Sequence, residues 1–169
     1  MTGASVSPEA VWAVLATVPD PEIPTVSMVD LGIIEAVRVT DGVEVELLPT
    51  FSGCPALDWM RQSVEEALAP LGLPVRVSVN RRATWHSDRI TPQGREKLRA
   101  SGFAPPPVQG LLELSSTLPD LDVELADGVA CPHCGSRETT LDTPFGPTLC
   151  RAIYRCRSCR QPFEQFKPV

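Results

Sequence analysis

Residues 33–48, IIEAVRVTDGVEVELL, decide the fold of the N-terminal part of the chain. Apolar residues recur over 33–39 and over 43–48 with the spacing of strands that bury one face. Thr40, Asp41 and Gly42 separate the two runs, and an Asp-Gly pair at such a place is a strong signal for a tight hairpin turn. The stretch therefore predicts two antiparallel strands.

The flanking sequence adds helices and a third strand. Ser7 and Pro8 are a good N-cap and first residue for a helix over about 8–17. Pro55 opens a second helix that runs to Pro70, and residues 74–79 alternate as a third strand. Because a helix joins the second strand to the third, these two strands should run parallel through a right-handed crossover.

A further helix is expected over residues 91–100, closed by Gly102. Together these elements predict an α+β fold, a small mixed sheet with flanking helices, over residues 1–103. Three consecutive prolines at 105–107 open a stretch without clear periodicity, so we expect a linker over 104–128. Residues 129–169 form a separate C-terminal module.

Composition and charge limit the classes of protein to consider. No apolar run reaches the roughly 20 residues needed to cross a bilayer, and the N-terminus resembles no export signal, so we expect a cytoplasmic protein. Residues 1–130 carry 9 Lys+Arg against 18 Asp+Glu, whereas residues 131–169 carry 6 against 3. An acidic body repels nucleic acid, so a protein or metal partner is the better expectation.

Two CxxC motifs, Cys131–Cys134 and Cys156–Cys159, are separated by 21 residues. This spacing is typical of a four-cysteine zinc site, and a chain expected to remain reduced favours metal over disulfides. Short strands over 152–155 and 163–166 would complete a zinc ribbon. A site with four sulfur ligands has no open position, so we expect a structural metal.

Other side chains in the tail have competing interpretations. His133 lies inside a CxxC motif and is expected at the surface. Cys150 is interpreted as a packed side chain, with an alternative as a ligand if the metal is iron or a cluster. Four arginines between residues 151 and 160 favour a protein-docking face over nucleic-acid binding, because no aromatic stacking pattern accompanies them.

Cys54 is the one cysteine outside the tail. As the expected N-cap of a helix that starts at Pro55, it should have a lowered pKa and serve as a nucleophile or metal ligand. A buried structural cysteine is the equal alternative. Asp20, Glu22 and Asp30 lie beside rigid turns and could form a metal or partner site, although turn capping explains them equally well. We find no convincing catalytic residue.

Several motifs resemble the small α/β family of iron-sulfur assembly proteins that includes SufT: DPEIP at 20–24, VDLG at 29–32, TFSGCP at 50–55, WHSD at 85–88 and GFAPP at 102–106. With the cysteine-rich tail, the combination resembles the D-subunit family of bacterial phenylacetyl-CoA epoxidases. The resemblance implies oxygenase and reductase subunits as partners, and a transient iron or iron-sulfur cluster as cargo. It also favours Cys54 as a cluster-handling thiol, with Asp20, Glu22 and Asp30 as candidate neighbours.

Three hypotheses follow. The first is an accessory protein without independent activity that helps to mature the epoxidase, with the zinc ribbon as its docking module. The second is a stoichiometric oxygenase component that assists electron transfer, which requires iron in the tail. The third is a zinc-ribbon regulator that binds nucleic acid. The sequence leaves a homodimer open.

Overall fold

The structure is a computed structural model that describes residues 6–51, 53–107 and 128–167. The chain divides into two compact units. The N-terminal unit comprises Met1–Trp85 with Arg89–Gly94, and the C-terminal unit comprises His86–Asp88 with Arg95–Val169. Among the described residues, no helix has the length and apolar character that crossing a bilayer requires.

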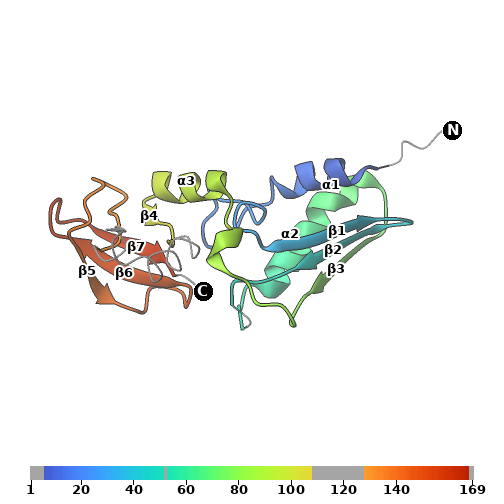
Figure 1. Cartoon of the computed structure of the whole chain (residues 1–169). Coiled ribbons are helices and arrows are strands. Elements are labelled where there is room, and N and C mark those ends of the chain that lie inside the picture. The colour runs from blue at the N-terminus through green and yellow to red at the C-terminus, as the bar shows by residue number, and fades with distance from the viewer. Residues whose placement is uncertain (1–5, 52, 108–127, 168–169) are drawn as a thin grey trace, which may run out of the picture. The chain divides into compact units, whose positions relative to one another are not determined.

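The N-terminal unit is built on a three-stranded sheet in the order β1-β2-β3 (Figure 1). The strands are β1 (Ile34–Val39), β2 (Val43–Leu47) and β3 (Val75–Val79). β1 and β2 are antiparallel, with Val37 opposite Val45, whereas β2 and β3 are parallel. The expected hairpin and the parallel crossover are both confirmed.

Two helices cover one face of this sheet (Figure 1). α1 (Pro8–Leu15) contacts β1 and α2, and α2 (Leu57–Leu68) contacts β3 and continues into a 3₁₀ turn, Ala69–Leu71. Apolar side chains spaced by three or four residues on both helices pack against alternate strand residues. Buried members of this core include Val11, Leu15, Val45, Leu47, Met60, Val64 and Leu68.

The segment between α1 and β1 has little regular structure but is tightly packed. Pro19 and Ser27 form an isolated β-bridge, and Val26, Met28 and Leu31 are buried. Trp85, itself 2% exposed, donates its indole N–H to the backbone oxygen of Leu31 at 2.9 Å. A loop is thereby fixed onto the sheet by its own apolar residues.

The C-terminal unit contains a four-stranded sheet in the order β4-β7-β6-β5. Its strands are β4 (Phe103–Ala104), β5 (Thr139–Thr143), β6 (Arg151–Cys156) and β7 (Pro162–Phe166). The antiparallel β6–β7 pair confirms the two short strands expected in the tail. The unit also holds the first two residues of a 3₁₀ turn (Ser87–Arg89) and most of α3 (Pro92–Ala100).

The two-residue strand β4 pairs in parallel with β7, and Ala104 is 1% exposed. Ala104 is the first residue of the expected linker, so the structure extends the ribbon sheet to a part of the chain where no ribbon strand was expected. A strand of two residues is too short to show alternation in a sequence. The domain boundary at residue 103 stays a prediction, and residues 108–127 of the expected linker lie outside the described residues.

Candidate functional site

The four cysteines of the two CxxC motifs converge in the C-terminal unit. Their sulfurs all lie within 4.8 Å of one another. The sulfurs of Cys131 and Cys159 are 3.7 Å apart, and those of Cys134 and Cys156 are 3.6 Å apart. Four sulfurs at about 2.3 Å from a central ion in a tetrahedron are separated by about 3.8 Å. The four residues therefore fit a tetrahedral metal, which would hold the two motifs together.

Both CxxC motifs have the same backbone geometry. The N–H of Cys131 donates to the carbonyl of Ser136 at 2.9 Å, and the N–H of Cys156 donates to that of Gln161 at 3.0 Å. The residue after each motif is left-handed, with φ of 75° at Gly135 and 64° at Arg160. Glycine adopts this conformation readily, whereas a residue with a Cβ such as Arg160 rarely does.

Backbone hydrogen bonds also prepare the sulfurs for a metal. The N–H of Cys159 donates to Cys156 Sγ at 3.5 Å and lowers the pKa of Cys156 to about 6. Thiolate is the form that binds metal. The backbone N–H of Gln161 acts in the same direction on Cys159, but burial and the contacts with the other three sulfurs raise the pKa of Cys159 to about 12.

The other candidate side chains of the tail lie outside this group. Cys150 Sγ lies 3.2 Å from Thr148 Oγ1 and is not one of the four clustered sulfurs. His133 is exposed, as expected, and is not among the grouped ligand atoms. The structure therefore favours the packed interpretation of Cys150.

Two of the four arginines of the tail have carboxylate partners within the ribbon. Arg151 is nearly buried, pairs with Glu164 at 2.8 Å and lies over the ring of Phe103 at 5.4 Å. Arg155 pairs with Asp142 at 3.1 Å. At least these two have structural partners, which weakens the argument that the cluster is a docking or nucleic-acid face.

An apolar surface is present instead around the connection between β5 and β6. Phe145 is 70% exposed, Leu149 58% and Leu141 50%. Two hydrogen bonds from the segment fix its shape, Phe145 N–H to Thr143 Oγ1 and Gly146 N–H to the carbonyl of Arg151. Exposed apolar groups on an ordered segment are typical of a protein-binding surface. Sequence reasoning missed them, because an apolar residue in a turn is not by itself a signal.

The prediction that Cys54 caps a helix is wrong. α2 begins at Leu57 and its N-cap is Ala56, so Cys54 lies in the turn before the helix. The pKa of the half-buried Cys54 thiol is raised rather than lowered. Burial is the largest cause; the N–H of Ala56 opposes it, and the charges of Glu22 and Asp20 add to it. Pro55 lies in the turn and is not the first residue of the helix. The Cys54 thiol is therefore not at the helix N-terminus.

The three carboxylates near the turns have different roles. Asp20 Oδ1 accepts the backbone N–H groups of Glu22 and Ile23, both at 2.9 Å. Asp30 Oδ2 accepts the N–H of Ser27 at 3.0 Å and its hydroxyl at 2.8 Å. Turn capping is thus present at both aspartates.

Asp20 and Glu22 also act on Cys54 through their charges. Within the described part of the chain, the four tail cysteines are the one group of at least three clustered metal-ligating atoms. Cys54 and its acidic neighbours are therefore no preformed three-ligand site.

Comparisons with known proteins match the N-terminal and C-terminal parts of the chain to two different family models. A family model described as iron-sulfur cluster assembly protein matches residues 8–80, and one described as PaaD zinc beta ribbon domain matches residues 119–167. The chain is 38% identical to the putative D subunit of 1,2-phenylacetyl-CoA epoxidase from Escherichia coli (strain K12). The match extends over 161 residues, 94% of this chain and 92% of the relative.

Two solved structures match part of the chain. A crystal structure of a domain of unknown function, DUF59, from Bacillus anthracis matches with a TM-score of 0.50 at 24% identity, covering 53% of this chain and 89% of the other. This match shows a shared fold. A solution structure from Mycobacterium tuberculosis, of a protein associated with Fe-S complex assembly and repair, is 32% identical and covers 61% of this chain and 95% of the other, with a TM-score of 0.35.

Proposed function

Because the chain belongs to the D-subunit family of 1,2-phenylacetyl-CoA epoxidases, we propose that it is an accessory protein that helps to mature the iron centres of such an epoxidase. The partners are the oxygenase and reductase components. The observation that carries the proposal is a lone half-buried thiol with two carboxylates acting on it, in a domain that matches the iron-sulfur assembly family.

The electrostatics of Cys54 favour a metal ligand over a nucleophile. A raised pKa leaves the thiol protonated at neutral pH, and a protonated thiol is a poor nucleophile. The same negative charges that disfavour a thiolate attract a cation. Iron bound at Cys54 would displace the proton and have its charge balanced by Asp20 and Glu22.

A site with one thiol and no preformed partner ligands is suited to transfer. Structural metal sites supply all their ligands from the protein, as the four tail cysteines do. Cys54 supplies one, so the remaining positions of a bound iron or cluster stay open to a donor or an acceptor protein. Weak and incomplete coordination allows the cargo to leave.

The C-terminal ribbon is proposed to hold zinc and to dock on the epoxidase. Its fully coordinated site has no position for substrate, which suits a structural role. Phe145, Leu149 and Leu141 supply the exposed apolar contact area.

The test is phenylacetyl-CoA epoxidation by purified oxygenase and reductase, made in cells with the protein, without it, or with Cys54→Ala. We expect components made with the protein to work without its addition in the assay. Components made without it, or with C54A, should be inactive and low in iron. Cys150→Ala is the matched control, because it removes a half-buried thiol outside both sites. Full activity with folded C54A would contradict the role of Cys54.

A stoichiometric component that assists electron transfer is the second candidate. It is favoured by one observation, that four cysteine sulfurs within 4.8 Å of one another fit iron as well as zinc. Iron in the tail would give the purified protein visible absorption, whereas zinc would leave it colourless. Activity that requires the protein in every assay, together with colour, would replace the maturation proposal.

A further inference from the structure

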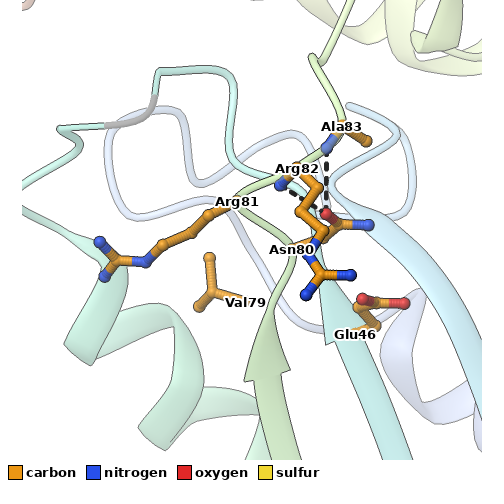
Figure 2. A pocket seen from close by; sticks show the side chains of 6 residues that line it. All are labelled: Glu46, Val79, Asn80, Arg81, Arg82 and Ala83. Carbon is orange, nitrogen blue, oxygen red and sulfur yellow. Dashed lines mark hydrogen bonds between the residues drawn. The ribbon is translucent and has the colours of Figure 1, made fainter.

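A hollow in the N-terminal unit lies apart from the residues discussed so far (Figure 2). It has a volume of about 620 Å³, within the range of about 300–1,000 Å³ typical of small-molecule sites. Six residues line it: Glu46, Val79, Asn80, Arg81, Arg82 and Ala83. They come from the end of β2, the end of β3 and the loop that follows β3.

The hollow lies at the carboxyl ends of two neighbouring strands of the sheet, β2 and β3. β2 and β3 are parallel neighbours, so both carboxyl ends reach the same edge. Crevices outside the carboxyl ends of parallel strands are where open α/β sheets commonly bind ligands. The loop that carries Cys54 also follows β2, whereas the loop with the two arginines follows β3.

Hydrogen bonds shape the arginine loop. Asn80 donates its backbone N–H to Leu47 at 2.8 Å, which ties the loop to the end of β2. Asn80 Oδ1 accepts the N–H groups of Arg82 and Ala83 at 2.9 and 3.0 Å. Figure 2 shows the consequence: Arg82 turns toward Glu46, while Arg81 extends to the other side of Val79. The loop therefore presents two separate guanidinium groups around the hollow.

Arg81 and Arg82 are not explained by ion pairs within the unit. The N-terminal unit carries 6 Lys+Arg and 11 Asp+Glu, a formal charge of −5. Arg61 pairs with Asp58 and Arg89 with Glu35. In the described part of the chain, Arg81 and Arg82 form no ion pair. The N-terminal unit is acidic overall, yet Arg81 and Arg82 lie together at the hollow without an ion-pair partner among the described residues.

We propose that this hollow binds a small ligand that carries a phosphate group together with a hydroxyl or amine donor. A guanidinium matches phosphate oxygens with a planar pair of N–H donors. Asn80 Oδ1 is used by the turn, so its Nδ2 group serves as a further donor to the ligand. Glu46 would repel phosphate but accepts a hydrogen bond from a hydroxyl or amine, and Val79 contributes apolar contact.

The test uses the full chain with its metal and isothermal titration with four probes: inorganic phosphate, pyrophosphate, ADP and coenzyme A. We expect binding by at least one probe that weakens with salt. Preference for ADP identifies a nucleotide, and preference for coenzyme A identifies a coenzyme A derivative. Binding of phosphate or pyrophosphate without any gain from the larger probes would overturn the proposed contact of Glu46 with a hydroxyl or amine.

Variants locate the site. Arg81→Ala and Arg82→Ala should each weaken binding by about 10-fold or more, because a lost hydrogen bond to a charged group has that scale. Both side chains are exposed, so folding should be retained, which thermal unfolding checks. Arg38→Ala on β1 is the control, because it removes an exposed arginine that does not line the hollow.

Two outcomes would overturn the proposal. The first is no binding of any probe at millimolar concentration. The second is binding that R81A and R82A leave as strong as in R38A. Retention of an acidic peptide by Arg81 and Arg82, with none of the four probes bound, would assign the surface to a protein partner instead.

Discussion

Replacing Cys156 by serine tests the metal centre most directly. The side chain of Cys156 is fully buried, and its sulfur lies 3.6 Å from that of Cys134. It also belongs to the apolar cluster with Ala104, Cys131 and Phe163, so the metal and the core of the ribbon occupy the same place. The substitution should therefore affect both metal binding and folding of the C-terminal unit.

The magnitude follows from the coordination. Changes in groups that only orient a metal ligand cost about 10- to 100-fold in affinity, so loss of a ligand should cost more than about 100-fold. Structural zinc sites in small peptides supply about 10–16 kcal/mol at pH 7. A ribbon with a core of this size has little other stability to replace that contribution. We expect C156S to lose its metal and the strands around it to open.

The measurements are metal content per chain after a chelator challenge and hydrogen exchange of the β6 and β7 amides. Wild type and Cys150→Ser should each keep one metal and slow exchange, because Cys150 lies outside the four-sulfur group. C156S should keep none and exchange fast. Retention of one metal by C156S, or loss of metal from C150S, would refute the assignment of the ligands.

Three further predictions concern separate parts of the molecule. The pH midpoint for alkylation of Cys54, followed by peptide mass spectrometry, should lie above that of an unperturbed thiol, because the pKa of Cys54 is raised, and Glu22→Gln should lower it by removing a negative charge. A midpoint below that of an unperturbed thiol would contradict the raised pKa. Trp85→Phe should reduce the free energy of unfolding in urea by about 1–3 kcal/mol, because the backbone oxygen of Leu31 loses its donor; an unchanged value would mean that water replaces it. Phe145→Ala should weaken binding to the oxygenase component by about five-fold or more at unchanged metal content, and equal affinity would exclude Phe145 from the interface.

Local sequence patterns were enough to predict much of the fold and the group of four cysteines. The strand–turn–strand of residues 33–48 and the helix that follows it fixed one antiparallel and one parallel pairing, as the structure has them. The two CxxC motifs predicted the four sulfurs that converge. Each of these signals spans a few residues, and the geometry it implies is set by turns and side-chain periodicity within that span.

The environment of Cys54 could not be predicted in this way. Its thiol was expected to be acidic because Pro55 resembled the first residue of a helix, yet the helix starts at Leu57. Burial and the charges of Asp20 and Glu22, which lie more than thirty residues earlier in the chain, decide its pKa. Such long-range terms have no local signature.

The sequence by itself thus determined the three strands of the N-terminal sheet, the parallel pairing of β2 and β3, and the four cysteines that cluster, since each follows from patterns along the chain. The tertiary structure decided which polar groups are buried, that Ala104 joins the ribbon sheet, and that Arg81 and Arg82 meet Glu46 around one hollow. These features depend on how distant segments pack. The free energy of burying or exposing a charge is set by that packing.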